Sequence, residues 1–227
     1  MKVAASWSGG KDSCFACFKA IQEGFKVVNL LTMMSRDGRS NFHMIKADLL
    51  DAQAKALGIP LIKRETTSIT YEQEFKKSLQ QLKIAGVQGL VTGDISEVPL
   101  HEEGWLNRIC REIGLKPIKP LWNLDTKQIF CEFINSGFEA VVVRVNTKLL
   151  NLNWLGRRLN ERFFRDIVEI GNVDPCGEGG EYHTLVTDGP SFKKRIQILE
   201  SRKTTLDSSG QLEIKQFKVI KKRRGLR

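Results

Sequence analysis

The sequence predicts an α/β fold in which a parallel β-sheet carries helices on both faces and a smaller α+β domain follows. Strand-like and helix-like segments alternate through the first half of the chain, and parallel neighbours need such crossover connections. The alternation stops at a proline-containing stretch, Lys116–Pro120. We therefore expect two domains, residues 1–120 and residues 121–227.

The elements of the first domain follow from apolar periodicity and from stop signals. Strands are expected at Lys2–Trp7, Phe25–Met34, Leu61–Glu65 and Gly89–Thr92. Helices are expected between them at Asp12–Gln22, Ile45–Leu57, Tyr71–Ile84 and Trp105–Ile113. Because parallel sheets bind ligands beyond the carboxyl ends of their strands, the segments of interest are Ser6–Ser13, Thr32–Phe42 and Thr92–Val98.

The second domain mixes both kinds of element. Helical patterns cover Asp125–Asn135 and Trp154–Asp166, and a glycine-rich loop covers Asn172–Glu181. Strands are expected at Ala140–Val145, Tyr182–Thr187, Arg195–Glu200 and Leu212–Ile220. The last two flank a turn sequence, Asp207–Gly210, which predicts a hairpin.

Composition narrows the class of protein. The chain has 227 residues, of which 41% are apolar, so an ordinary core is expected. No apolar run approaches the roughly 20 residues of a membrane span, and the first residues turn polar too soon for a signal peptide. Five scattered cysteines are typical of reduced thiols. A cytoplasmic protein without a membrane segment is expected.

The net charge of +10 is concentrated at the C-terminal end. Residues 193–227 hold twelve Lys or Arg and three Asp or Glu, a balance of +9. Such a tail could bind RNA or another acidic partner by neutralising phosphates. A solvated tail is the favoured interpretation, and nucleic acid is the less favoured partner.

The motif with the clearest chemistry is Ser8-Gly9-Gly10-Lys11-Asp12-Ser13, between the first strand and the first helix. Glycines let the backbone approach an anion, and a helix start offers unpaired N–H groups and a positive dipole end. Lys11 adds a charge, and the serines add hydroxyl groups. The motif matches neither the Walker A nor the dinucleotide fingerprint. It predicts a pyrophosphate-binding loop.

This motif resembles the PP-loop of the ATP pyrophosphatases, which split ATP between the α and β phosphates. Three further motifs resemble the diphthine–ammonia ligase family: Trp154–Arg158, Asp174–Thr184 and Asp188–Pro190. Thr92–Ile95 and Pro120–Trp122 also fit that family, although Asp94 and Asp174–Gly177 look closer to bacterial relatives. The resemblance implies a five-stranded, Rossmann-like (HUP-type) sheet and a ligase that adenylates a carboxyl group and transfers ammonia, releasing AMP and pyrophosphate.

Site residues follow from these motifs. The expected ATP-binding set is Ser6, Ser8, Gly9, Gly10, Lys11, Asp12, Ser13, Thr32, Gly93 and Asp94, with Mg²⁺ held by Asp12 and Asp94. The expected catalytic residues are Lys11, Asp12, Glu178 and Glu181, because an amidation needs charge relief and a group that orients or deprotonates ammonia. The expected substrate-binding residues are His43, Arg157, Glu178, Gly179, Gly180, Glu181 and His183.

Several alternatives stay open. The implied partners are ATP, ammonia and either a protein acceptor similar to elongation factor 2 or a small carboxylate. A tRNA-modifying PP-loop enzyme and a non-catalytic adenine-nucleotide sensor are the rival functions, and a homodimer is one option for the oligomeric state. Cys14, Cys17 and Trp105 are expected in the core, and Cys176 is expected to be more exposed.

Overall fold

The computed structural model describes residues 1–41, 43–96 and 104–222, and the chain forms two compact units. The first unit comprises Met1–Ser8, Asp12–Ala54 and Ile59–Leu124. The second comprises Gly9–Lys11, Lys55–Gly58 and Asp125–Arg227. Two short pieces from the N-terminal half therefore belong to the unit that contains the C-terminal half.

A five-stranded parallel sheet forms the centre of the first unit. Its strands are β1 (Lys2–Ser6), β2 (Lys26–Met34), β3 (Leu61–Glu65), β4 (Gly89–Val91) and β5 (Lys116–Ile118), in the order β3-β2-β1-β4-β5. The expected α/β class and parallel sheet are confirmed. Apolar patterning missed β5, which has three residues and contains a proline; a proline is tolerated there because β5 is an edge strand.

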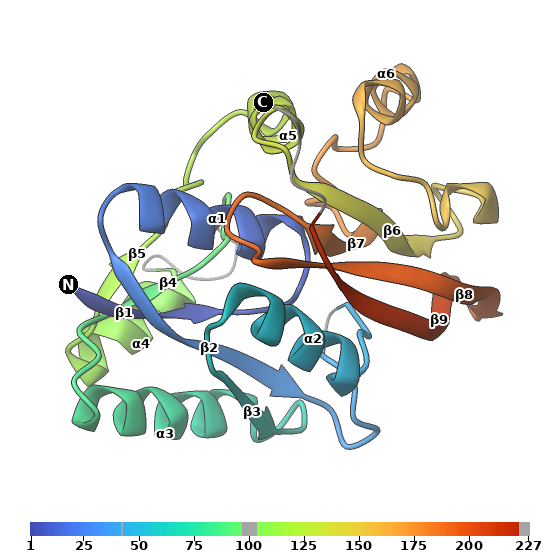
Figure 1. Ribbon diagram of the computed structural model, residues 1–227. Coiled ribbons are helices and arrows are strands. Elements are labelled where there is room, and N and C mark those ends of the chain that lie inside the picture. Colours follow the sequence, from blue (N-terminus) through green and yellow to red (C-terminus); the bar gives the residue numbers. More distant parts are fainter. Residues whose placement is uncertain (42, 97–103, 223–227) are drawn as a thin grey trace. The chain divides into compact units, whose positions relative to one another are not determined.

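The strand order reverses beside β1, and this reversal determines where a ligand can bind. The helices α1 (Lys11–Gln22), α2 (Ala47–Leu57), α3 (Tyr71–Ile84) and α4 (Trp105–Ile113) connect successive strands. Figure 1 shows α1 and α3 on opposite faces of the sheet, as right-handed crossovers in opposite directions require. Connections that diverge from β1 and β4 leave a crevice at the carboxyl ends of these two strands.

A continuous apolar core lies between the sheet and the two helices α3 and α4. Leu79 on α3 and Ile109 on α4 are fully buried there, together with Leu90 on β4 and Ala4 on β1. Buried positions on α3 recur at helical spacing, which is why its apolar stripe could be recognised in the sequence. This packing fixes the first residues of both helices at the edge of the sheet.

The second unit contains a four-stranded antiparallel sheet in the order β7-β6-β9-β8. Its elements are α5 (Thr126–Asn135), β6 (Glu139–Asn146), the 3₁₀ turn η1 (Leu152–Trp154), α6 (Glu161–Glu169), β7 (Tyr182–Asp188), β8 (Lys194–Leu206) and β9 (Ser209–Lys221). The expected β8–β9 hairpin is confirmed. The expected helix at Trp154–Asp166 is wrong in its start, because Gly156 adopts a positive φ of 81° and Asn160 caps a helix that begins at Glu161.

Parts of two expected features lie outside the described residues. These are Phe42, Glu97 and Val98 of the strand-exit segments, and Arg223, Arg224 and Arg227 of the basic tail. None of the helices in the described part of the chain is long and apolar enough to cross a bilayer.

Replacing Leu79 by Ala tests the packing of α3. Leu79 is fully buried in the apolar core, so the change should lower the free energy of unfolding by about 2–5 kcal/mol. Ile84→Ala, on the same helix but 88% exposed, is the matched control and should change it by less than about 0.5 kcal/mol. Urea denaturation measures both values. Equal effects of the two changes would contradict the assigned face of α3.

Candidate functional site

A cavity of about 600 Å³ opens in the first unit at the carboxyl edge of its sheet. It lies beyond the ends of β1, β2 and β4, beside the first residues of α3 and α4. Eight of the residues expected from the sequence line it: Ser6, Ser8, Asp12, Ser13, Thr32, His43, Gly93 and Asp94. The strand-order reversal thus brings together residues that are up to 88 positions apart in the chain.

Hydrogen bonds fix the exit of β1. The Thr32 hydroxyl donates to the carbonyl oxygen of Trp7 at 2.6 Å, and the Trp7 indole donates to Gln53 Oε1 at 3.1 Å. The hydroxyl oxygens of Ser8 and Ser13 lie 3.0 Å apart, so the loop closes onto the first turn of α1. Two hydroxyl groups therefore stand at the start of a helix, where an anion is stabilised by N–H groups and by the helix dipole.

Gly93 is required by a close backbone approach. A Cβ atom at this position would lie 2.6 Å from the carbonyl carbon of Asp12 and 2.7 Å from the amide nitrogen of Ser13. Because these atoms belong to the backbone, they cannot rotate away as a side chain would. The absence of a side chain at Gly93 therefore lets the exit of β4 contact the first turn of α1.

Two carboxylates, those of Asp12 and Asp94, face this cavity. Burial raises the pKa of Asp94; the Thr92 hydroxyl, which donates to Asp94 at 3.0 Å, and the Lys119 charge lower it, and the negative charge of Asp12 raises it. Two mutually repelling carboxylates beside an anion-binding helix start are a donor set that suits Mg²⁺, which prefers carboxylate and phosphate oxygens. The residues present therefore fit this ion.

An aromatic wall completes the cavity. It consists of Tyr71 and Phe75 on α3 and Trp105 on α4, whose ring centroids are 5.3–6.1 Å apart. The Trp105 indole donates to Glu72 Oε2 at 2.9 Å, and burial together with the Asp94 charge raises the pKa of Tyr71 to about 12. The expectation that Trp105 is a core residue is incomplete, because this ring is only half-buried and lines the cavity.

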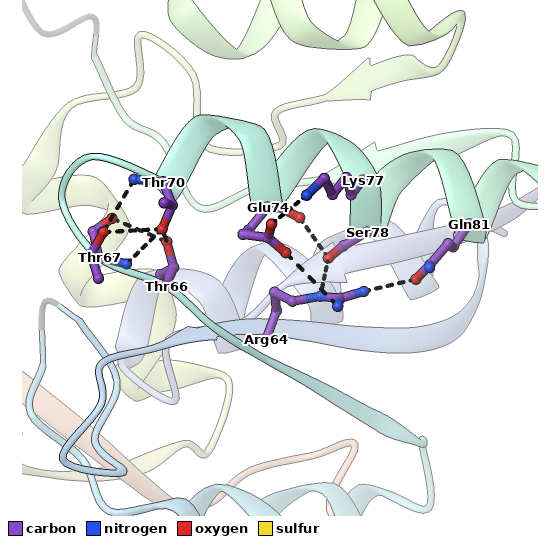
Figure 2. Close-up of polar contacts among 8 residues, drawn as sticks. All are labelled: Arg64, Thr66, Thr67, Thr70, Glu74, Lys77, Ser78 and Gln81. Carbon is purple, nitrogen blue, oxygen red and sulfur yellow. Dashed lines mark hydrogen bonds and ion pairs between the residues drawn. The ribbon is translucent and has the colours of Figure 1, made fainter.

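Figure 2 shows the polar network that fixes the start of α3. Arg64, at the end of β3, donates to the Ser78 hydroxyl at 3.2 Å and to Gln81 Oε1 at 2.9 Å. In the turn before the helix, the Thr67 amide donates to the Thr70 hydroxyl at 3.0 Å, and the Thr70 amide donates to the Thr67 hydroxyl at 3.2 Å. The Arg64 contacts hold the middle of α3 beside β3, and the Thr67–Thr70 pair holds the turn that precedes Tyr71, which lines the cavity.

Sequence reasoning missed the aromatic wall, Trp7, Lys119 and Trp122 as cavity residues. Tyr71 and Trp105 are the first residues of helices that follow strands of the same parallel sheet. Such residues lie at the carboxyl edge, so their positions carried a signal. Their apolar character concealed it, because aromatic residues at helical spacing are more often core residues.

In the second unit, the glycine-rich loop surrounds the carboxylate of Glu181. Its Oε1 atom accepts a hydrogen bond from the Asp174 amide at 2.9 Å, whereas Oε2 is buried and has no hydrogen-bond partner among the described residues. A Cβ atom on Gly179 would lie 2.8 Å from Oε1, so a side chain at this position would force the Glu181 carboxylate to shift. Glu178, by contrast, is exposed. The loop thus holds one buried carboxylate oxygen ready for a donor or a cation.

Gly9, Gly10 and Lys11 are not among the residues lining the cavity; they belong to the second unit. The Lys11 amide donates to the Thr184 hydroxyl at 3.0 Å, and its ammonium donates to the carbonyl oxygen of Cys176. This ammonium lies 5.8 Å from the centre of the Tyr182 ring. Lys11 is therefore engaged with the glycine-rich loop in this structure.

Two further expected residues of the second unit have defined surroundings. Burial lowers the pKa of His183 to about 4, and the positive charges of Arg144 and Lys11 contribute to this lowering, so its imidazole is neutral at neutral pH. The Arg157 guanidinium donates to the Asp166 carboxylate and lies 4.2 Å from the centre of the Trp154 ring. Arg157 is thus held by its own unit.

Three of the five cysteines, Cys14, Cys17 and Cys110, are not suited to nucleophilic chemistry because burial disfavours their thiolate form. Burial raises the pKa of Cys17 to about 12 and that of Cys110 to about 11, and it also raises the pKa of Cys14. The expected core position of Cys14 and Cys17 is confirmed. The expectation that Cys176 is exposed is wrong: it is 2% exposed, and its thiol donates to the carbonyl oxygen of Thr126 at 3.2 Å.

Comparison with known proteins identifies similar chains. Residues 1–117 match the family model of the diphthamide synthase N-terminal domain, and residues 125–220 match that of the C-terminal domain. The diphthine–ammonia ligase of Danio rerio is 28% identical over 236 residues, covering 92% of this chain and 90% of the relative. The Homo sapiens ligase is 27% identical over 92% of this chain and 86% of the relative.

Two other matches differ in extent. The ligase of Schizosaccharomyces pombe is 28% identical over 93% of this chain, which spans only 38% of the relative's length. A crystal structure described as a predicted subunit of tRNA methyltransferase from Methanocaldococcus jannaschii has a TM-score of 0.48 and 18% identity. That match covers 84% of this chain and 98% of the other.

Gly93→Ala tests the close approach at the cavity. The added Cβ atom would displace the backbone of Asp12 and Ser13, so we expect at least a tenfold loss of ATP affinity and a free energy of unfolding lowered by about 1–3 kcal/mol. Calorimetric titration and urea denaturation measure these quantities. Gly24→Ala is the control, because a Cβ atom there meets no atom within 4 Å. The Gly24→Ala variant should be destabilised only by the strain of its positive φ and should keep its affinity for ATP. Equal ATP affinity in the two variants would contradict a role in ATP binding for the contact between Gly93 and α1.

His183 makes stability depend on pH. Its pKa is about 4 in the folded protein and about 6.5 in the unfolded chain, so the unfolded chain binds more protons between these values. The free energy of unfolding should therefore fall as the pH decreases from 6.5 to 4, with a slope of up to about 1.4 kcal/mol per pH unit, and this contribution is complete above pH 6.5. In His183→Gln this part of the slope should disappear. Identical pH profiles of the two proteins would refute the assignment.

Proposed function

Because this chain belongs to the diphthamide synthase family, we propose that it uses ATP and ammonia to convert a carboxyl group into an amide. The named relatives are ligases that form a carbon–nitrogen bond. The observation that carries the proposal is the cavity at the ends of β1, β2 and β4, which gathers eight residues expected to bind the nucleotide or the substrate.

The cavity of the first unit is the proposed ATP site. The phosphates would lie at the start of α1, where Ser8 and Ser13 offer hydroxyl groups and the helix offers its positive end. The adenosine would extend along the remaining cavity, in which Tyr71 and Trp105 present apolar ring surfaces. A volume of about 600 Å³ is within the usual range for small-molecule sites.

Asp12 and Asp94 are the residues that would hold Mg²⁺. When bound, this ion neutralises the charge that develops on the phosphate oxygens of the leaving group. The raised pKa of Asp94 supports this role, since a nearby cation would remove the repulsion between the two carboxylates.

The proposed reaction has two steps. A carboxylate oxygen of the acceptor attacks the α-phosphorus of ATP, and the bond between the α-phosphorus and the bridging oxygen breaks to release pyrophosphate. Ammonia then attacks the acyl carbon, AMP leaves, and the nitrogen loses one proton. The chain must therefore stabilise a diphosphate leaving group and accept or direct a proton.

We assign the acceptance of the proton that ammonia loses to the glycine-rich loop. Glu181 presents a buried carboxylate oxygen without a hydrogen-bond partner among the described residues, which suits an ammonium ion or the proton released from it. The flanking Glu178, Gly179 and Gly180 would contact the acceptor, together with His183 in its neutral form. A contact from Arg157 would require it to release Asp166.

Lys11 is the proposed cationic group for the leaving pyrophosphate. Its ammonium now donates to the Cys176 carbonyl oxygen, a neutral acceptor. Phosphate oxygens are stronger acceptors because they are charged, so exchange of the carbonyl for a phosphate is favourable. Gly9 and Gly10 carry no side chains, so the backbone before Lys11 can approach such an anion closely.

Product analysis tests the proposed function. The full chain is incubated with ATP, Mg²⁺, ¹⁵N-ammonium and an elongation factor that carries diphthine. We expect AMP and pyrophosphate in ³¹P spectra and one ¹⁵N atom per acceptor in mass spectra. Both products should depend on the acceptor. ADP and orthophosphate as the sole products would refute the proposal. ATP binding without turnover of this acceptor would exclude diphthine as the carboxyl substrate.

Glu181→Gln isolates the role of the buried carboxylate. The amide keeps the shape of the side chain but cannot accept a proton, so amide formation should slow by about 100-fold or more while ATP affinity is unchanged. Glu200→Gln is the control because Glu200 is an exposed carboxylate on β8 of the same unit. Wild-type rates in Glu181→Gln would exclude this carboxylate from the reaction.

A further inference from the structure

A second concave site lies in the second unit, and none of the residues assigned above line it. This hairpin crevice, of about 560 Å³, is lined by residues 139–141, 158–160, 187, 195–198 and 220. Strand β9 pairs with β6 only at Arg144–Asn146. The start of β6 is bonded instead to the segment before α6, where the Leu159 amide donates to the Ala140 carbonyl oxygen at 3.0 Å. The crevice lies between this segment and the β8–β9 hairpin.

Two arginines line the crevice, and neither is fully engaged. Arg195 donates through Nη2 to Glu139 Oε2 at 2.9 Å, but its Nε is buried and has no acceptor within the described part of the chain. The Arg158 side chain makes no hydrogen bond or ion pair with any described residue. Glu139 is the single carboxylate among the lining residues. The crevice therefore has one positive charge in excess and unused guanidinium donors.

The remaining polar groups also suit an anion. The N-terminus of α6 follows Asn160, whose side chain accepts from the Phe163 amide at 2.9 Å; its dipole favours an anion, whereas Glu161, which is not among the lining residues, opposes one. Gln197 has an exposed side chain on β8, and Lys218 lies opposite it on β9. Because residues that face each other across an antiparallel pair share one side of the sheet, Lys218 extends the positive surface beyond the crevice.

We propose that the hairpin crevice binds a phosphoryl group through Arg158 and Arg195. A planar guanidinium suits the tetrahedral oxygens of a phosphate by offering parallel N–H donors. A buried donor without an acceptor is unfavourable, and a ligand oxygen reached by a small shift of Arg195 would satisfy it. The volume exceeds what one phosphate fills, so the group belongs to a phosphorylated sugar or to a nucleotide of a single-stranded RNA.

The charge distribution around the crevice explains how such a ligand is attracted. Residues 193–222 hold nine Lys or Arg and three Asp or Glu, and most of them lie on the β8–β9 hairpin. A concave surface with one sign of charge concentrates ions of the opposite sign. The proposal thus gives a role to the basic C-terminal segment, which the ligase reaction leaves unused.

The test compares two phosphoryl ligands on the full chain. Ribose 5-phosphate and a short single-stranded oligouridylate are titrated by calorimetry, with α,β-methylene-ATP present to occupy the nucleotide cavity. Arg158→Gln is the informative variant because Arg158 has no partner in the described structure to disrupt. Arg202→Gln is the control, because Arg202 is an exposed arginine of the same unit, on β8, that does not line the crevice.

We expect Arg158→Gln to weaken binding at least tenfold and Arg202→Gln to weaken it less than twofold, with unchanged ATP affinity and melting temperature in both. Binding of ribose 5-phosphate alone would identify a small phosphorylated molecule as the source of the group, and binding of the oligouridylate would identify an RNA backbone. The proposal is overturned if neither ligand binds, or if the two variants lose affinity equally.

Discussion

The contact between Gly93 and the first turn of α1 is the constraint on which the cavity of the first unit depends. Strand β4 ends beside β1 because the strand order reverses there, and the missing side chain lets the two exits meet at backbone distance. The hydroxyls of Ser8 and Ser13 and the carboxylates of Asp12 and Asp94 are consequently gathered at one edge. A fold of this class can bind many ligands; the identity of a few exit residues decides which one.

Much of this arrangement could be predicted from the sequence because its signals are local. Periodicity and glycine stops located the helices and four of the five parallel strands, and the Ser8–Ser13 motif marked the loop before α1. Strand β5 was missed because three residues with a central proline carry no alternation. The aromatic wall was missed because pattern alone cannot separate a ring that packs in a core from one that lines a cavity.

Long-range contacts set a second limit on sequence reasoning. Lys11 was expected beside phosphates, but its present acceptor is the Cys176 carbonyl, 165 positions later in the chain. Cys176 was expected to be exposed, yet its thiol is covered and bonded to Thr126. Neither arrangement has a local signature, since each depends on how the glycine-rich loop closes over its own carboxylate.

The route of the backbone has a consequence for dividing this protein into fragments. Residues 9–11 and 55–58 cluster with the C-terminal half, where the Val186 amide donates to the Gly9 carbonyl oxygen at 3.0 Å and the Lys193 amide to that of Ala56 at 2.7 Å. A cut after Leu124 would leave these amides without their acceptors. A fragment that begins at Asp125 would therefore lack two short pieces of its own compact unit, and a chimera joined at that position would have to supply their sequences from the new N-terminal partner.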